Sequence, residues 1–259
     1  MSIQSINRAV AILRCFSEAE PELSVTQLSQ RLDLHKSTVS RMLSTLEEEG
    51  LISQNPRNSQ YRLGVGLISM AGVALGQVDV RGAAYQYLDS LVQATQETIT
   101  VNILDGQDCL NVDNKASPKP LRYASWIGRR LPLHCTASGK ILLANLTPQQ
   151  RRELLPPPLR PYTQNTIDTH EALDSELERV VACGYATVEE EFEQAFSAIA
   201  APVLDHRGRV AGAISVSGPT FRMPRETLLS FVEPLMETAA LASAELGHRG
   251  PLRIQPESA

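Results

Sequence analysis

The chain has 259 residues, with 24 Lys and Arg against 29 Asp and Glu and a formal net charge of -5. This length allows two domains, one of them with a substantial core. The negative net charge excludes a protein that binds nucleic acid through a strongly basic overall surface. No signal peptide pattern and no apolar run of membrane-spanning length is present, so we expect a cytoplasmic protein with no membrane partner. Four cysteines without metal-ligand or disulfide spacing predict buried, reduced thiols: Cys15, Cys109, Cys135 and Cys183.

The segment SVTQLSQRLDLHKSTVSRMLSTLEEEGLI, residues 24–52, predicts two short helices around a tight turn. Ser24 and Gln27 form a capping-box pattern, which predicts that the first helix begins directly after Ser24. The second helix is expected to end at Gly50. Apolar residues at helical spacing between positions 6 and 16 predict a further helix that closes a three-helix core.

The second of these helices is polar and basic over its first turn and a half. Residues outside its apolar stripe gather there, where a recognition helix contacts base edges and phosphates. Hydroxyls and helix N-terminal amides suit phosphate oxygens, and arginine binds a guanine edge or a phosphate. The candidate DNA-binding residues of this helix are His35, Lys36, Ser37, Thr38, Ser40 and Arg41.

Two short strand-like pieces surround the loop 55–59 and predict a hairpin, the wing of a winged helix. Arg57 near its tip and Tyr61 in its second strand are further candidates for DNA contact. Residues 1–63 hold seven basic and seven acidic side chains, so we expect modest non-specific affinity and a dimer that reads two half-sites. The alternative is a protein-binding module, which would show no salt-dependent affinity for DNA.

The rest of the chain predicts a linker helix and an α/β (α+β) domain. The apolar segment 64–78 suits a helix that packs against a partner chain. From residue 98 the hydrophobic period changes to two, which predicts an antiparallel sheet flanked by helices. Strands are expected near 98–104, 110–112, 121–127, 185–190, 198–204 and 210–217. Helices are expected near 81–96, 137–144, 148–155, 169–183 and 225–246.

The strand 210–217 presents two different faces. Ala211, Ala213, Ser215 and Ser217 alternate on one of them, and this face of small residues and hydroxyls leaves room beside it. The space could be a ligand cavity lined by hydrogen-bonding groups. It could equally admit a close-packed helix, and the residues alone do not separate these two interpretations.

The segment LHCTASGK, residues 133–140, predicts a strand that enters a turn opening a helix. Free amides at a helix N-terminus bind anions, carboxylates included. The alternative is a plain helix cap by Thr136 or Ser138. The segment lacks the Walker A pattern. Cys135 beside His134 forms no dyad, because neighbouring strand residues point to opposite faces.

Four acidic residues follow the strand expected near 185–190: Glu189, Glu190, Glu191 and Glu193. They could serve metal binding or acid/base chemistry, although a solvated loop is the more common origin of such a cluster. No histidine lies close enough in sequence to complete a metal site. We therefore predict no metal, no cofactor and no catalytic residue, with a small-molecule enzyme as the rival class.

Taken together, these segments resemble the IclR family of bacterial transcriptional regulators over nearly the whole chain. The resemblance rests on STVSRMLSTLEEEGLI (37–52), Tyr61-Arg62-Leu63-Gly64, LPLHCTASGKILLA (131–144) and IAAPVLDHRGRVAGAISVSGP (199–219). It implies a winged helix-turn-helix domain over 1–64, a linker helix over 65–80, a GAF/profilin-like effector-binding domain over 81–248, and a flexible tail over 249–259.

The resemblance also implies partners and a function. Members of the family act as homodimers or homotetramers on double-stranded DNA operators and bind small carboxylates or aromatic acids. We therefore expect a ligand-responsive regulator, a repressor of a catabolic or metabolic operon, that needs no cofactor. The alternative functions are a ligand-independent regulator or an enzyme built on the C-terminal domain.

By position, the resemblance places an effector pocket between the 137–139 turn, the strand with Ser215 and Ser217, and the stretch 188–198. The family's acidic and thiol ligand contacts fall on Val188 and Ala198, which implies a less polar pocket for a larger or more apolar ligand. The family usually has glycine where Ala195 stands. The candidate effector-binding residues are Leu104, Trp126, Leu133, Cys135, Ala137, Ser138, Gly139, Val188, Glu190, Ala198, Ser215 and Ser217.

Overall fold

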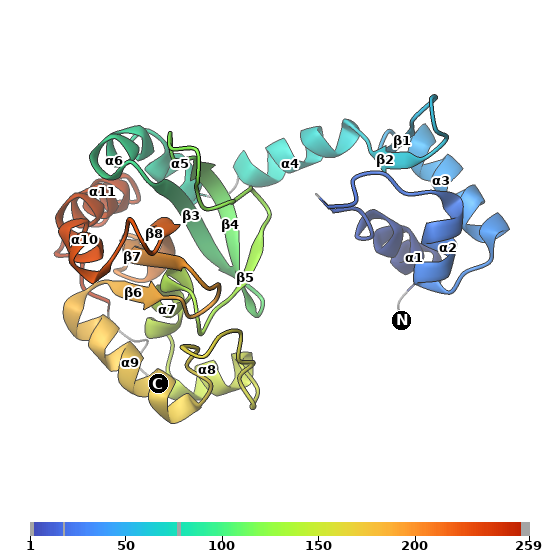
Figure 1. Cartoon of the computed structure of the whole chain (residues 1–259). Coiled ribbons are helices and arrows are strands. Elements are labelled where there is room, and N and C mark those ends of the chain that lie inside the picture. Colours follow the sequence, from blue (N-terminus) through green and yellow to red (C-terminus); the bar gives the residue numbers. More distant parts are fainter. Residues whose placement is uncertain (1–2, 18, 77–78, 255–259) are drawn as a thin grey trace. The chain divides into compact units, whose positions relative to one another are not determined.

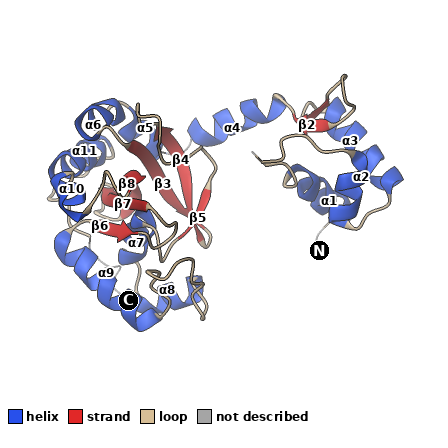
Figure 2. Cartoon of the chain, in the orientation of Figure 1, coloured by secondary structure: helices blue, strands red, loops and turns tan. Residues whose placement is uncertain are grey.

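A computed structural model describes residues 3–17, 19–76 and 79–254 of the chain. The chain divides into two compact units, residues 1–77 and 78–259, each of which has its own hydrophobic core (Figure 1). Within the described residues, no helix is both long enough and apolar enough to cross a membrane. The first unit is mainly helical and the second contains the large sheet (Figure 2).

The first unit is a winged helix-turn-helix, as the sequence predicts. Its elements are α1 (Gln4–Leu13), α2 (Val25–Leu32), α3 (Lys36–Glu48), β1 (Ile52–Gln54), β2 (Tyr61–Leu63) and α4 (Gly66–Gly76). The capping box is confirmed, because Ser24 Oγ accepts a hydrogen bond from the Gln27 amide and Gln27 Oε1 accepts one from the Ser24 amide. Asp33 ends α2 in a left-handed conformation with φ of 50°. Gly50 follows α3 with φ of +70°.

The start of α4 is fixed to the end of α3 by close backbone contact. The amide of Gly66 donates to the carbonyl oxygen of Gly50 over 3.0 Å, and a Cβ at Gly64 would lie 2.2 Å from the same oxygen. Only glycine fits at position 64. The helix then runs with large exposed apolar side chains: Ile68, Met70 and Val73. The linker helix was expected over 64–78, of which residues 77 and 78 lie outside the described residues.

The second unit is built on a six-stranded antiparallel sheet in the order β5-β4-β3-β8-β7-β6. Its strands are β3 (Thr98–Asp105), β4 (Asp108–Lys115), β5 (Arg130–Pro132), β6 (Ala186–Glu189), β7 (Phe196–Leu204) and β8 (Val210–Pro219). Its helices are α5 (Asp79–Tyr85), α6 (Leu88–Thr95), α7 (Ala137–Ala144), α8 (Pro148–Leu154), α9 (His170–Cys183), α10 (Arg225–Ser230) and α11 (Val232–Glu245).

The alternation along β8 separates two layers. Gly212 faces α5, since a Cβ there would lie 2.9 Å from a methyl of Val80, whereas Ala213 belongs to the core that includes α7. Helices α5, α6 and α11 pack together on one side of the sheet, and α7 contacts β3, β7 and β8 on the other. All eight residues of α7 are buried. Its two polar side chains are bonded within the protein, Ser138 to Asn102 and Lys140 to Glu176 and Glu191.

Three expectations about elements are wrong. Residues 121–127 form a loop, and the edge strand β5 follows it at 130–132. The helix expected over 225–246 is divided between α10 and α11, because Pro234 lacks an amide hydrogen and its ring clashes with the carbonyl of residue 230 in a continuous helix. The helix expected over 81–96 is divided between α5 and α6, and the side chains of Gln86 and Tyr87 at this break bond to Glu245 of α11.

The end of the described chain is packed rather than free. A tail was expected from residue 249, but Ile254 is 3% exposed and belongs to the core of the second unit. The carbonyl of Leu252 lies close to Gly184 after α9. The part of the expected tail beyond Ile254 lies outside the described residues.

Candidate functional site

The N-terminal end of α3 presents the predicted polar face to solvent. Its first helical residue follows His35, whose Nδ1 accepts a hydrogen bond from the Ser37 amide over 3.3 Å and lies 2.7 Å from the Ser37 hydroxyl oxygen. Five of the six predicted residues are exposed and Thr38 is half-buried. The exposed residues are His35, Lys36, Ser37, Ser40 and Arg41.

The basic groups of this face have no carboxylate partners. Across the residues that the structure describes, no ion pair involves Lys36, Arg41 or Arg57, whereas Arg31 on α2 pairs with Glu20. Unpaired exposed cations remain available to phosphate oxygens, which supply most of the affinity of proteins for DNA. Lys36 and Arg41 on α3 and Arg57 at the wing tip are therefore free to contact phosphate oxygens.

A carboxylate that the sequence analysis missed holds the wing. Glu22 accepts hydrogen bonds from Asn55 Nδ2 over 2.8 Å and Asn58 Nδ2 over 2.7 Å. These bonds, that from Asn58 first, lower the pKa of Glu22. Asn55 Oδ1 in turn accepts a hydrogen bond from the Arg57 amide, which fixes the turn that carries Arg57.

Tyr61 lies inside the first unit rather than on its DNA-facing surface. It is 8% exposed and belongs to the core formed with Leu23 and Ile52. Its backbone bonds to Leu23 in both directions and extends the wing sheet by one bridge. The prediction of a DNA contact by Tyr61 conflicts with this burial, because the hydrophobic pattern of the wing requires its ring in the core.

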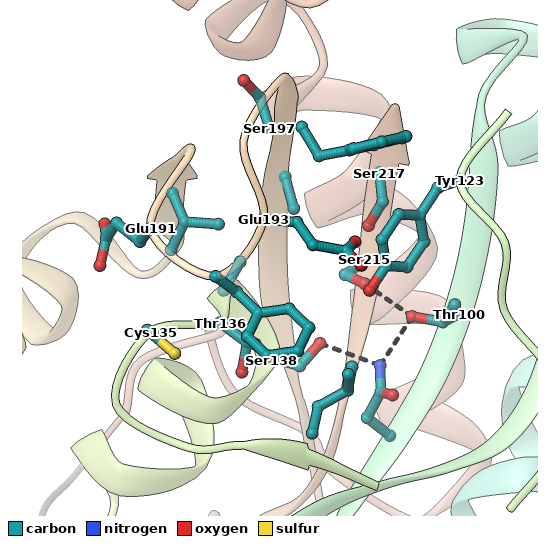
Figure 3. A pocket seen from close by; sticks show the side chains of 17 residues that line it. Thr100, Tyr123, Cys135, Thr136, Ser138, Glu191, Glu193, Ser197, Ser215 and Ser217 are labelled. Carbon is teal, nitrogen blue, oxygen red and sulfur yellow. Dashed lines mark hydrogen bonds between the residues drawn. The ribbon is translucent and has the colours of Figure 1, made fainter. Parts of the chain in front are cut away.

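The second unit contains a pocket where α7, β3, β7 and β8 meet the loop after β6 (Figure 3). With its side chains as they stand, the free volume of the pocket is about 50 Å³, enough for a few water-sized groups. Seven of the predicted effector-binding residues line it: Cys135, Ala137, Ser138, Val188, Ala198, Ser215 and Ser217.

The other five predicted residues do not line the pocket. Leu133 is fully buried in the core, and Leu104 packs against the same cluster. A Cβ at Gly139 would lie 2.2 Å from the Leu133 carbonyl oxygen, so Gly139 permits the close approach of strand and helix. Trp126 is 39% exposed and its ring faces the guanidinium of Arg129. Glu190 has φ of 58° and forms the turn after β6.

Ten lining residues were not among the candidates named from the sequence, although five of them lie in the stretch 188–198 that the resemblance placed at the pocket. Those on β3 carried a readable signal, because Thr100 and Asn102 alternate with apolar residues on a strand that is buried on both faces. Strand pairing places Thr100 opposite Ser215. The remaining residues come from the β4–β5 connection, β5, the N-cap of α7, the loop after β6 and the start of β7. The missed residues are Thr100, Asn102, Tyr123, Leu131, Thr136, Glu191, Phe192, Glu193, Phe196 and Ser197.

Aromatic rings reduce the space that small residues open. Val188 on β6 and Ala198 on β7 line the pocket with small or apolar side chains. Tyr123, Phe192 and Phe196 stand beside that room, and the rings of Tyr123 and Phe196 meet edge to face at 5.3 Å. A ligand larger than a few heavy atoms therefore requires these rings to turn.

Neutral hydrogen-bonding groups form the floor of the pocket. Asn102 Nδ2 donates to the hydroxyl oxygens of Thr100 over 2.8 Å and of Ser138 over 2.9 Å (Figure 3). The hydroxyl oxygens of Thr100 and Ser215 lie 2.7 Å apart. The Asn102 amide thus connects β3 to the first turn of α7, and Thr100 extends the network to Ser215 on β8.

The first turn of α7 has both a side-chain cap and free amides, the two features considered for the LHCTASGK segment. Thr136 is the N-cap, and its Oγ1 accepts a hydrogen bond from the Gly139 amide over 3.3 Å. Within the described part of the chain, the amides of Ala137 and Ser138 form no hydrogen bond. A capped helix with two free amides beside Ser138 is suited to bind an anion.

The four glutamates of the acidic cluster do not form a metal site. Glu191 bonds to the buried ammonium of Lys140 over 2.6 Å, Glu193 lies 3.7 Å from Arg129, and Glu189 lies 3.1 Å from Arg225. Burial raises the pKa of Glu191. No group of three or more metal-ligating side chains occurs among the described residues.

The cysteines and histidine near the pocket form no nucleophilic pair. Cys135 is fully buried, which raises the pKa of its thiol to about 12 and keeps it neutral. His134 Nε2 lies 3.0 Å from the Arg160 carbonyl oxygen. Burial of all four thiols was expected, but Cys183 at the end of α9 is exposed and Cys15 is half-buried.

Known protein families match both the first unit and the second unit of the chain. The IclR helix-turn-helix domain model matches residues 5–56, and the model of the bacterial transcriptional regulator IclR C-terminal domain matches residues 72–244. The HTH-type transcriptional regulator XynR of Escherichia coli (strain K12) is 37% identical over 247 residues, 95% of this chain and 98% of that protein. KdgR of the same organism is 35% identical over 248 residues, covering 95% and 94%.

Solved structures agree with these sequence matches. An IclR transcriptional regulator from Alicyclobacillus acidocaldarius superposes with a TM-score of 0.83 at 28% identity, covering 95% of this chain and 100% of that one. The Thermotoga maritima IclR superposes with a TM-score of 0.79 at 27% identity, covering 95% and 100%. The chain therefore belongs to the IclR family of bacterial DNA-binding transcriptional regulators.

Proposed function

We propose that this regulator represses a catabolic or metabolic operon in the cytoplasm and that a small organic or aromatic acid relieves the repression. The single observation that carries the proposal is the pocket floor, where hydroxyls converge on the uncapped amides of α7. The effector is the finer part of the proposal, whereas DNA binding follows from the family.

The DNA-binding part rests on exposed side chains of α3 and the wing. Lys36, Arg41 and Arg57 are unpaired within the described residues, and Ser37 and Ser40 place hydroxyls on the same helix. A recognition helix with this distribution reads a half-site in the major groove of double-stranded DNA. Because the net charge is negative, a homodimer or homotetramer that engages two half-sites gives the required affinity.

The effector-binding part rests on the character of the pocket. Among the described residues, no lysine or arginine lines it, and its two carboxylates, Glu191 and Glu193, pair with Lys140 and Arg129. An acid would therefore bind through neutral donors, namely the hydroxyls of Ser138, Ser215 and Ser217 and the α7 amides. Helix N-termini favour negative charge by about 0.3–1 kcal/mol each.

Coupling between the two parts would work as a shift between conformations. A ligand alters operator affinity only if it binds one geometry of the oligomer more tightly than the other, and coupling free energies of about 1–3 kcal/mol are typical. The apolar helix α4, with Ile68, Met70 and Val73 exposed, supplies a surface on which such an oligomer can be held.

The test begins with selection of an operator from random duplex DNA by the full-length protein. Operator affinity is then measured by fluorescence anisotropy with and without each member of a panel of organic, aromatic and sugar acids. At least one acid should change the affinity about 5–150-fold. Ser217→Ala should lose this response while it keeps the affinity of the ligand-free protein for DNA.

Two outcomes would contradict the proposal. Operator affinity that stays constant across the panel, while thermal shift detects no bound acid, favours the ligand-independent regulator. Chemical conversion of any bound acid by the protein would favour the enzyme. An acid that strengthens operator binding would retain the effector and reverse the sign of regulation.

A further inference from the structure

Arg129 lies where several side chains beside the pocket meet. Its guanidinium carbon lies 4.9 Å from the ring centroid of Tyr123 and 4.9 Å from that of Trp126. Its Nη2 lies 3.7 Å from Glu193 Oε1, and its Nη1 donates a hydrogen bond to the carbonyl oxygen of Ala124. The Arg129 side chain is 13% exposed, so these partners enclose most of it.

Two of these partners line the pocket from different segments of the chain. Tyr123 belongs to the β4–β5 connection and Glu193 to the loop after β6, and Figure 3 shows both side chains reaching into the pocket. The Tyr123 ring also meets Phe196 at the start of β7, edge to face at 5.3 Å. The contacts of Arg129 therefore connect two walls of the pocket where aromatic rings reduce its space.

The wall formed by the loop after β6 is held at both ends. Thr163 Oγ1 donates a hydrogen bond to the carbonyl oxygen of Glu190 over 2.5 Å. The amide of Thr220 donates to the carbonyl oxygen of Ala195 over 2.8 Å. This loop is therefore fixed in place without any help from Arg129.

The wall formed by the β4–β5 connection is held mainly by side chains. Among the described residues, the segment 121–127 forms one backbone–backbone hydrogen bond, which Trp126 accepts from the Arg129 amide over 3.1 Å. Thr98 Oγ1 donates to the carbonyl oxygen of Tyr123 over 3.3 Å. The backbone of this segment thus has few ties to the sheet, and the guanidinium of Arg129 lies over both of its rings.

We propose that Arg129 is a latch on the effector pocket: its contacts with two rings and with Glu193 hold the β4–β5 connection against the loop after β6 and keep the pocket narrow. Arg129 can do so because its own backbone is anchored to β4, where the Asn111 amide donates to its carbonyl oxygen over 2.9 Å. A ligand enters when these contacts break and the Tyr123 ring turns away. The inference rests on the proposed function only in taking the cavity as the effector pocket, because the narrowing is measurable without an effector.

The latch reduces the affinity of any ligand that needs the wider form of the pocket. The apparent affinity of such a ligand is lowered by the fraction of molecules that are in the wide form. Two cation–π contacts and one partly exposed ion pair together favour the narrow form about tenfold or more. Removal of the guanidinium should therefore raise the population of the wide form by a similar factor.

The experiment measures how fast a thiol inside the pocket reacts with N-ethylmaleimide in the full-length protein. Ser217→Cys supplies the thiol, because Ser217 lines the pocket and is 7% exposed (Figure 3). Cys109 is the internal reference, since it is fully buried and does not line the pocket. Peptide mass spectrometry gives both rates in one sample. Adding Arg129→Ala should raise the rate at position 217 about tenfold or more and leave the rate at Cys109 unchanged.

Two further variants separate the latch from a general effect on stability. Arg130→Ala is the matched control, because Arg130 is the next residue and pairs with Asp105 and Asp108 instead of the rings. It should leave the rate at position 217 unchanged. Arg129→Lys keeps the charge but loses the planar group that stacks on the rings, so it should raise this rate by a smaller factor. It takes the place of Arg129→Ala if that variant does not fold.

The outcomes separate the latch from the proposed function. An unchanged rate at position 217 in Arg129→Ala, or in Arg129→Lys as its substitute, overturns the latch. A parallel rise at Cys109 or an equal effect of Arg130→Ala also overturns it, because either shows a general loosening of the second unit. Faster reaction at position 217 alone supports the latch whether or not any acid binds. Failure of every acid in the panel would instead overturn the proposed effector class.

Discussion

The recognition helix and the pocket handle charge in opposite ways. On α3 and the wing, Lys36, Arg41 and Arg57 stand exposed without ion pairs among the described residues. Around the pocket, the carboxylates of Glu191 and Glu193 have cationic partners, and the floor consists of neutral hydroxyls and an amide. The exposed cations of α3 and the wing can attract the phosphates of DNA over a long range, whereas the neutral groups of the pocket select a ligand only by direct contact.

This difference predicts different responses to salt. Binding that neutralises phosphates releases counterions, so affinity falls steeply as salt rises. Binding through neutral donors in a buried pocket depends on geometry and is screened much less. A single titration of salt should therefore weaken operator binding strongly while it leaves effector affinity nearly constant, and the substitutions below disturb one side at a time.

The largest expected effect is on the pocket side. Gly139→Ala would place a Cβ 2.2 Å from the Leu133 carbonyl oxygen and 2.6 Å from Thr136 Oγ1, so the start of α7 must move. We expect the second unit to lose about 3 kcal/mol or more of stability. Chemical denaturation measures this loss. Gly72→Ala is the control, since a Cβ there meets nothing within 4 Å, and an unchanged stability of Gly139→Ala would contradict the described packing.

On the DNA side, Arg41→Ala should weaken operator binding without altering effector affinity. Loss of a guanine or phosphate contact costs about 1–3 kcal/mol, roughly tenfold or more, and loss of a phosphate contact lowers the salt slope by about 1. Arg31→Ala is the matched control, because Arg31 is paired with Glu20. Equal operator affinity for Arg41→Ala and the unmodified protein would show that this part of α3 does not face DNA.

A smaller and opposite effect is expected at Ala195, after β6. Its φ of 63° is left-handed, a conformation that costs alanine more than glycine and that accounts for glycine in the family pattern. Ala195→Gly should stabilise the second unit by about 0.5–1 kcal/mol after the added freedom of the unfolded chain is subtracted. Thermal unfolding should show a rise of about 2 °C. Ala172→Gly, within α9, should instead destabilise the protein.

The smallest expected effect concerns the wing of the first unit, where Glu22 is held by two asparagines. The Asn58 and Asn55 bonds lower the pKa of Glu22 in the folded state. Their contribution is therefore fully present above the ordinary glutamate pKa of 4.5 and is lost as pH falls through the lower folded value. Carboxyl NMR titration should show Glu22 protonating at lower pH than a free glutamate. In Asn58→Ala the pKa should return toward 4.5, and hydrogen exchange in the wing should rise.

Local periodicity accounts for what could be predicted about the first unit. The capping box at Ser24, the apolar spacing of α3 and the glycine at position 50 each act within a few residues, so the sequence alone located the helices and the exposed polar face. The burial of Tyr61 was not foreseen, because a wing residue looks alike in sequence whether it faces solvent or the core. Only the packing against Leu23 and Ile52 decides its direction.

The pocket could be predicted only in part, because its walls meet through the sheet. Ser215 and Ser217 were found from the alternation along one strand, and Val188 and Ala198 from family resemblance. Asn102 required the knowledge that β3 pairs with β8 rather than with another strand. Trp126 was a candidate for effector binding, whereas its segment forms a loop and its ring faces Arg129.

The junction between α3 and α4 gives the first unit a mechanical property. Gly66 bonds to the carbonyl of Gly50, and position 64 leaves no room for any side chain against that same oxygen. The backbone contacts between Gly50 and residues 64 and 66 therefore make a rigid connection between the end of the recognition helix and the first turn of α4. We therefore expect a rotation of the first turn of α4 to be passed on to the C-terminal end of the recognition helix.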